Sequence, residues 1–136
     1  MPTISHHAAL IYVMVVVSAS DGTMSEKELR AIGDLTKHLP VFRHFDEQRL
    51  IQVSQECASI LTEPDGLTAV LGLIGQNLPE HLRETAYWLA LEVTLTDTHV
   101  MIEEIRVLEL LRRSLNLDRL VAAALERGAR ARYQTA

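Results

Sequence analysis

Hydrophobic residues recur at helical spacing between residues 25 and 39. They stand three or four positions apart, the spacing that places side chains on one face of an α-helix. These positions are Leu29, Ile32, Leu35 and Leu39. Ser25 and Glu28 predict a capping box at the start of this helix, and Pro40 predicts its end. An amphipathic helix with one apolar face is therefore expected here.

The same period continues through the rest of the chain. Five further helices are predicted to begin at Asp46, at Thr62 with Pro64, at Pro79, at Met101, and at Asn116 or Asp118. Two short segments, VMVVV and LEVTL, have high β propensity, and strands are the local alternative there. Neither segment shows polar–apolar alternation or a hairpin turn, so the pattern favours helix throughout.

The stretch from Ala8 to Ala19 is uncharged and almost wholly apolar. Its 12 residues fall short of the roughly 20 that a helix needs to span a bilayer. The preceding MPTISHH contains no Lys or Arg, which a secretory signal would place there. We therefore predict a helix that is apolar on all sides and surrounded by the others.

The chain aligns with itself when it is shifted by 76 residues. Tyr12 falls on Trp88, Asp21 on Asp97, Glu28 on Glu104 and Leu29 on Ile105. Helices one to three therefore resemble helices five to seven, and the fourth connects them. We predict a single all-α domain over residues 1–136, a bundle of about seven helices with an internal two-fold repeat around a central pair.

Charge and cysteine content narrow the classes of function. The formal net charge of −5 disfavours a general nucleic-acid binder, because such proteins are usually basic. Cys57 is the single cysteine, so no internal disulfide is possible. Its apolar surroundings in the sequence predict a small buried side chain and not a nucleophile.

Two acidic motifs occupy matching positions in the two halves. The segments SASDGTMSEKELRAI and TLTDTHVMIEEIRVL resemble the tellurite-resistance TerB family and TerB-like domains. The first motif matches at Asp21, Gly22 and Glu28. The second keeps Asp97 and Glu104 but has Thr where Gly is usual. The resemblance extends over nearly the whole chain.

The resemblance carries several expectations. It implies an all-helical, non-enzymatic bacterial protein of the cytoplasm, linked to tellurite resistance and the stress response. Such a protein would act as a scaffold or sensor with other proteins as partners, and peripheral association with the membrane is one option. It also implies that the acidic residues bind a divalent cation.

The residues themselves leave two interpretations of the acidic loops open. Carboxylate and loop carbonyl oxygens are ligands for Ca²⁺, Mg²⁺ or Mn²⁺, which makes Asp21, Glu28, Asp97 and Glu104 the candidate metal ligands. Alternatively the acids only cap helices, and the chain is purely a protein-interaction module. An enzyme using these carboxylates is the least favoured reading, because no nucleophile or base motif accompanies them.

Three further features carry smaller predictions. Glu92 replaces Val16 of the first half and is expected to mark the exposed face of its helix. His99 is expected to be a solvated loop histidine. The basic segment Arg127 to Tyr133 is expected to complement the dipole of the last helix and then to fray.

Overall fold

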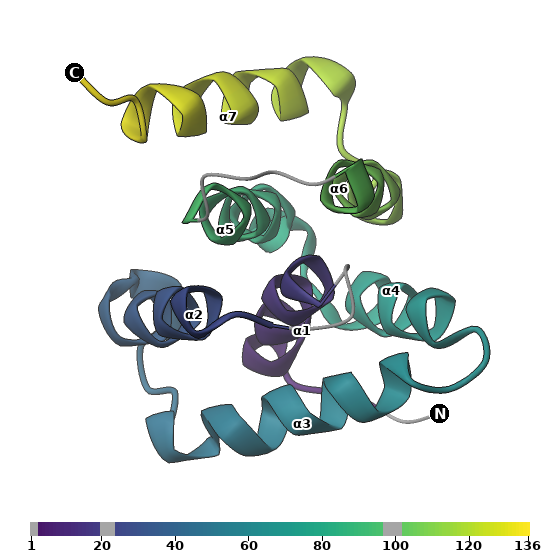
Figure 1. Cartoon of the computed structure of the whole chain (residues 1–136). Helices are drawn as coiled ribbons and strands as arrows, with labels where there is room; N and C mark the ends of the chain where they lie inside the picture. Colours follow the sequence, from purple (N-terminus) through teal and green to yellow (C-terminus); the bar gives the residue numbers. More distant parts are fainter. Residues whose placement is uncertain (1–2, 20–23, 97–101) are drawn as a thin grey trace.

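The chain folds as an all-α bundle in the computed structural model, which describes residues 3–19, 24–96 and 102–136 (Figure 1). In this part of the chain there are seven α-helices and no strand. The helices are α1 (His6–Ser18), α2 (Glu26–His38), α3 (Leu50–Leu61), α4 (Gly66–Asn77), α5 (Arg83–Thr96), α6 (Ile102–Ser114) and α7 (Arg119–Arg132). Short 3-10 turns occur at η1 (Pro40–Phe42), η2 (Glu47–Arg49) and η3 (Glu80–Leu82). The predicted all-α bundle of about seven helices is confirmed.

Helix α1 forms the centre of the bundle. It packs against α2, α3, α4, α5 and α6, and every residue from Ala8 to Ser18 is buried. A helix enclosed on all sides has no face to expose to water, which explains why the sequence shows no polar stripe there. None of the helices in the described ranges is long and apolar enough to cross a membrane.

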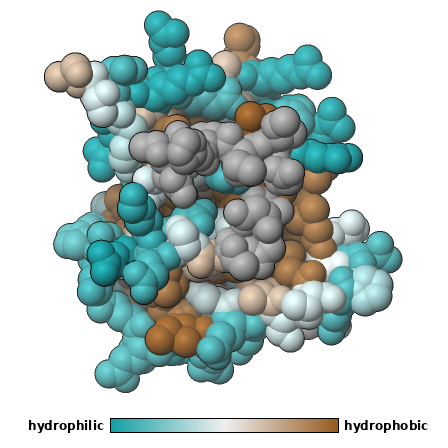
Figure 2. Space-filling view, viewed as in Figure 1, coloured by the Kyte–Doolittle hydropathy of each residue, from teal (hydrophilic) through white to brown (hydrophobic). Residues whose placement is uncertain are grey.

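Helix α5 is the second central element and packs directly on α1. On its outer side α5 carries α7, while α2 packs along its flank and α6 lies beside it (Figure 1). In the same view the outer helices present mostly hydrophilic residues, and hydrophobic residues gather in patches between them (Figure 2). This arrangement leaves α5 buried on its α1 side and flanked by other helices elsewhere.

The helix ends follow local capping chemistry. The predicted capping box is present at α2: the Glu28 backbone N–H donates to Ser25 Oγ at 3.1 Å, and the Ser25 N–H donates to Glu28 Oε1 at 2.9 Å. Helix α2 ends before Pro40, as predicted. Asp118 caps α7 by accepting from the Leu120 N–H at 2.9 Å. Here the sequence signals place the boundaries correctly.

Three predicted starts differ from the structure by a few residues. Asp46 caps the η2 turn instead of α3, and Pro79 precedes the η3 turn, so α5 begins only at Arg83. Helix α4 begins at Gly66 and not at Thr62, because Asp65 takes a left-handed conformation with φ of 59°. In the first two cases a 3-10 turn tightens the entry to the helix, which capping rules alone do not distinguish from an α-helical start.

The apolar face predicted for α2 is partly wrong, and the same holds at the position of α6 that the repeat aligns with Leu29. Leu29 and Ile105 are 47% and 56% exposed. The inward stripe of α2 consists of Glu28, Ile32 and Thr36, at intervals of four residues. Because Leu29 follows Glu28 by one residue, it lies about 100° around the helix from that stripe. Ile105 follows the buried Glu104 in the same way.

The internal repeat stays a prediction. The bounds of α2 and α6 differ by 76 residues at both ends, the same shift that aligns the sequence. Glu28 and Glu104 are both buried, and the residue that follows each is exposed. Superposing the half of the chain that contains α2 on the half that contains α6 would test the repeat.

Candidate functional site

The four candidate metal ligands fall into two groups. Asp21 and Asp97 lie outside the described residues, as does His99. Glu28 and Glu104 each hold the third position of their helix, and they are 7% and 6% exposed. Two of the four predicted residues are therefore placed, in matching positions at the first turns of α2 and α6.

Helix capping already occupies Glu28. Its Oε1 accepts the Ser25 N–H, and a carboxylate in the first turn also interacts favourably with the helix dipole. Glu104 stands at the same position in α6, where the dipole acts on it in the same direction. Within the described ranges no group of three or more His, Cys, Asp or Glu residues is arranged to hold a metal ion.

Glu92 is a buried carboxylate that contacts three other side chains. It is only 5% exposed, so the prediction that it marks an exposed face is wrong. Trp88 Nε1–H donates to its Oε1 at 3.1 Å, and Tyr133 O–H donates to its Oε2 at 2.8 Å. Arg132 Nε forms an ion pair with Oε1 at 2.7 Å. A buried charge is tolerated here because donors from α5 and from the end of α7 meet it.

The packing of α7 on α5 brings Arg132 and Tyr133 to Glu92. Gly128 faces the Trp88 ring so closely that an added Cβ would lie 3.4 Å from Cζ3. Helix α7 then continues through Arg132, and Tyr133 closes it. The basic segment is therefore helical through Arg132, and fraying beyond it stays a prediction. Arg132 does more than complement the helix dipole, because it forms an ion pair with Glu92 of α5.

Two signals in the sequence could have indicated this cluster. Trp88 precedes Glu92 by four residues, so both lie on one face of the same helix. The chain also carries an Arg–Tyr pair at the end of its last helix, both of which can donate to a carboxylate. Burial raises the pKa of Tyr133, and its hydrogen bond to Glu92 adds to the effect.

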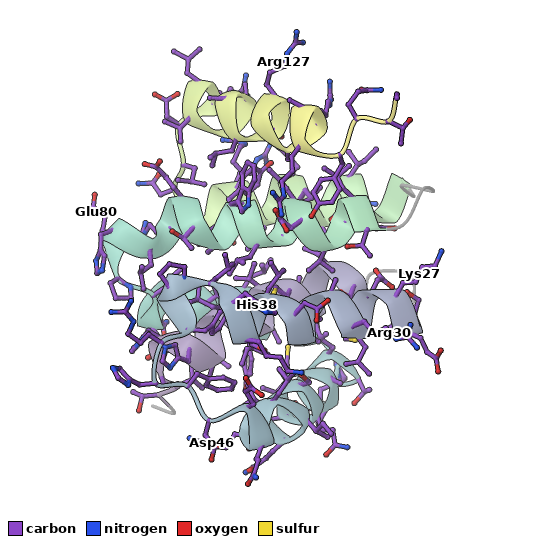
Figure 3. The ribbon with its side chains drawn as sticks, turned by 90° about the vertical axis from the view of Figure 1, so that its left-hand side faces the viewer. Lys27, Arg30, His38, Asp46, Glu80 and Arg127 are labelled. Atoms are coloured by element: carbon purple, nitrogen blue, oxygen red, sulfur yellow. The ribbon has the colours of Figure 1, made fainter. Side chains whose placement is uncertain are left out.

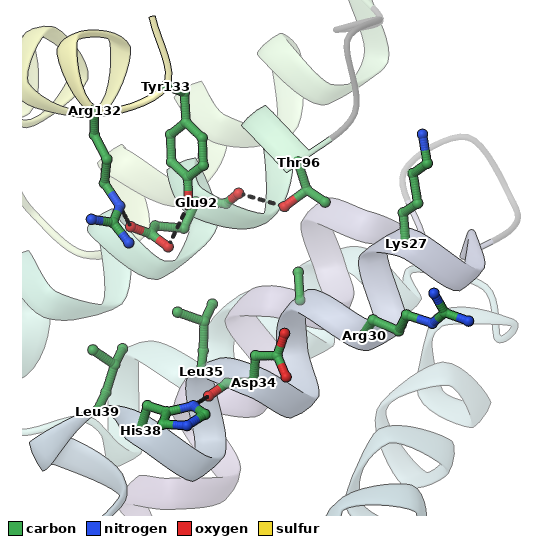
Figure 4. Close-up of a pocket in the computed structure, with 11 residues that line it drawn as sticks. Lys27, Arg30, Asp34, Leu35, His38, Leu39, Glu92, Thr96, Arg132 and Tyr133 are labelled. Atoms are coloured by element: carbon green, nitrogen blue, oxygen red, sulfur yellow. Dashed lines mark hydrogen bonds and ion pairs between the residues drawn. The ribbon is translucent and has the colours of Figure 1, made fainter. Parts of the chain in front are cut away.

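A groove runs along α5 beside this cluster, between α2 and α7. These two helices pack on α5, which forms the floor, while they form the walls (Figure 3). One part of the groove, of about 550 Å³, contains Glu92 and the residues drawn in Figure 4. The other part, of about 610 Å³, lies toward the N-terminus of α5 and contains Trp88. Both parts are lined by Leu39, the residue that follows α2, so they adjoin each other there.

The two parts of this groove, which we name the α5 groove, differ in chemistry. The part near the start of α5 is mostly apolar and is lined by Leu39, Pro40, Val41, Leu82, Trp88 and Leu125, with Glu84 and Thr85 at its edge. The part near the end of α5 carries Lys27, Arg30 and Arg132. Figure 4 shows Leu35 and Leu39 pointing from α2 toward α5, below the Arg132–Glu92–Tyr133 cluster.

Two other features lie away from the α5 groove. A smaller hollow of about 440 Å³ lies on the opposite flank of α5, where the Tyr87 hydroxyl donates to Glu126 at 2.7 Å. Cys57 is fully buried, as predicted, and burial raises the pKa of its thiol to about 12. Such a thiol is not a nucleophile at neutral pH.

Comparison with protein-family models, with curated proteins and with solved structures gives no match for this chain. The fold and the site therefore define the class of protein directly: an all-α bundle with a groove along one of its two central helices. The resemblance to TerB rests on the two acidic motifs.

Proposed function

We propose that this chain is a non-enzymatic, TerB-like helical domain that works as a scaffold or sensor by binding another protein in the α5 groove. The bacterial cytoplasm is the proposed compartment, and tellurite resistance or the stress response is the proposed process. The observation that carries the proposal is the groove, whose two parts adjoin at Leu39 and are both lined by residues of α5.

The composition of the groove supports a protein ligand. It combines a large aromatic side chain, aliphatic residues and arginine, the residue types that are enriched in protein interfaces. Glu92 already accepts from three donors, so its role in the groove is to position Arg132 and Trp88. This arrangement gives a preformed surface with fixed anchors.

Site-specific photo-crosslinking in the cells that make the protein tests the proposal. A photoreactive amino acid replaces Glu84 in one variant and Arg30 in another, because these exposed residues line the two parts of the groove. The control replaces Ile51, an exposed residue of α3, which lines neither part. We expect the same protein to be crosslinked from both groove positions and not from Ile51. Equal crosslinking from all three positions would contradict the proposal.

Cation binding by the two acidic loops is the second candidate function. Glu28 and Glu104 are buried at equivalent first turns, and each follows the segment that carries Asp21 or Asp97. Oxygen ligands of this kind suit Ca²⁺, Mg²⁺ or Mn²⁺. The four residues would then act as a divalent-cation sensor beside the protein-binding groove.

Thermal unfolding with each of these cations tests the second candidate. A cation that binds the native state at 100 times its Kd adds about 2.7 kcal/mol to the free energy of unfolding. The increase should disappear in the double variant Asp21→Asn/Asp97→Asn. An equal increase in the wild type and the double variant, or none at millimolar cation, would exclude these residues as ligands.

A further inference from the structure

We propose that the α5 groove binds an acidic amphipathic helix of a partner protein, with the apolar residues of that helix against Trp88 and its carboxylates against Lys27, Arg30 and Arg132. This inference rests on the proposed function and names the chemistry of the partner. It follows from the different chemistry of the two parts of the groove, from the length of the groove, and from the fact that helices form its walls.

The apolar part of the groove provides the anchoring surface. Trp88 is partly buried in the floor, and Leu39, which follows α2, and Leu125 of α7 line the same part. Burial of apolar area against such a surface drives association, offset in part by the cost of ordering the partner. A partner helix would place two or three aliphatic or aromatic side chains here.

The other part of the groove selects the charge of the partner. Lys27 and Arg30 are exposed, and the Arg132 side chain is 61% exposed despite its ion pair with Glu92. Among the carboxylates lining this part, Glu92 is buried and bonded, which leaves Asp34 as the exposed one. The charge of Arg132 is offset by its ion pair with Glu92. Lys27 and Arg30 against Asp34 then leave a local excess of one positive charge, on a chain whose net charge is −5. An acidic segment is therefore favoured over a basic one.

The charge pattern also fixes the direction of the bound helix. Glu84 is exposed at the apolar end, whereas Lys27 and Arg30 lie at the far end of α2 (Figure 3). A helix with carboxylates at one end is attracted in one orientation and repelled in the other. The acidic end should lie beside the last turn of α5.

The length and the surroundings of the groove favour a helix over an extended peptide. Leu82 and Thr96 mark its two ends and are 14 residues apart, which is about 21 Å along a helix axis. A partner helix of about 14 residues would fill it. An extended peptide would leave its backbone N–H and C=O groups unpaired against the apolar wall, because the helices that form the groove offer no strand edge.

Selection from a displayed library of random 14-residue peptides lacking tryptophan tests the inference. Binding of the selected peptides is then measured by the fluorescence of Trp88, the single tryptophan of the chain, which lies in the groove. We expect peptides with apolar residues at helical spacing near one end and Asp or Glu near the other. Their binding should change Trp88 emission.

Charge-reversal variants make the test specific. Lys27→Glu/Arg30→Glu should weaken binding of the selected peptides about tenfold or more, because two attractions become repulsions. The control Arg43→Glu/Arg49→Glu changes the net charge equally at exposed positions outside the groove and should leave binding unchanged. Both sites are on the surface, so the fold should survive, and circular dichroism checks that it does.

A second pair of variants probes the apolar part. Leu125→Ala should reduce affinity about fivefold by removing apolar contact with the peptide. Leu120→Ala is the matched control, because Leu120 is exposed on the same helix and does not line the groove.

The outcomes separate this inference from the proposed function. Selected peptides that change Trp88 emission but are not acidic, or that bind equally to Lys27→Glu/Arg30→Glu, would overturn the inferred chemistry and leave the groove as a binding site. A dimer of the chain that this double variant dissociates, seen by sedimentation, would make a second copy the occupant and also overturn it. No selected peptide that changes Trp88 emission would overturn both.

Discussion

Replacing Glu92 with alanine should destabilise the protein far more than replacing an exposed carboxylate of the same helix. The carboxylate holds together side chains from α5 and from the end of α7: Trp88, Arg132 and Tyr133. In Glu92→Ala the three donors lose their shared acceptor. The last turn of α7 then loses its attachment to α5.

The magnitude follows from the exposure of each partner. A hydrogen bond to a charged group contributes about 1.5–3 kcal/mol, and burying the carboxylate itself offsets part of this. Arg132 is largely exposed, so its pair with Glu92 adds little to this sum. The net loss for Glu92→Ala should be about 2–3 kcal/mol. For 136 residues the unfolding entropy is about 0.29 kcal/mol/K, so Tm should fall by about 9 °C.

Urea unfolding followed by far-ultraviolet circular dichroism measures this loss without using the fluorescence of Trp88. The midpoint should fall while the m-value stays constant. Glu84→Ala is the control, because Glu84 is an exposed carboxylate on the same helix. Its free energy of unfolding should lie within about 0.5 kcal/mol of the wild type.

A double-mutant cycle isolates the link between α5 and α7. Glu92→Ala and Tyr133→Phe should show a coupling energy of about 1 kcal/mol, because each removes one side of the same hydrogen bond. Additive effects of the two changes, or a loss for Glu92→Ala no larger than that for Glu84→Ala, would refute the reasoning.

Two other predictions address the core and the helices. The Cys57 thiol has its pKa raised by burial from 9.0 to about 12, so its contribution to stability is complete below pH 9 and is lost as the pH rises toward 12. Between pH 8 and pH 10 the wild type should therefore lose about 1.4 kcal/mol more than Cys57→Ala in urea titrations, and equal losses would contradict the assignment. Gly33→Ala should stabilise the protein by about 0.5–1 kcal/mol, because a Cβ there meets nothing within 4 Å and alanine favours the helix. Gly66→Ala should destabilise it by about 2 kcal/mol or more, because a Cβ there collides with the backbone of Ile60 and Leu61. Thermal unfolding compares the two variants, and a change in Tm of the same sign in both would contradict the prediction.

The sequence was sufficient to predict the helices and the buried position of α1. Local capping signals such as Ser25 with Glu28 act within one turn, so they can be interpreted without knowing the rest of the fold. The stretch around Val13 has no polar stripe, and only enclosure by other helices accounts for that. These features depend on composition and spacing alone.

The environment of Glu92 could not be predicted in the same way. A single acid in an apolar helix usually marks an exposed face, since an unpaired buried carboxylate is costly. Here the donors Arg132 and Tyr133 lie 40 and 41 residues further along the chain. Only the packing of α7 over Trp88 brings them together, and sequence spacing does not reveal that packing.

The α5 groove was missed for a related reason. Leu39, Trp88 and Leu125 come from three separate helices, and each looks like an ordinary core residue of its own helix. The expected face of α2 also included Leu29, which the capping role of Glu28 turns outward. Surfaces built from several helices become visible only when the helices are assembled.

The central claim is that a partner binds in the α5 groove, and the indole N–H of Trp88 gives the most direct measurement. The chain has one tryptophan, so a ¹H–¹⁵N spectrum contains a single indole resonance, from the group that donates to Glu92. Adding a selected acidic 14-residue peptide should shift this resonance and the amides of Leu39 and Leu125. Shifts that instead centre on Tyr87 and Ile105, across α5, would contradict the account.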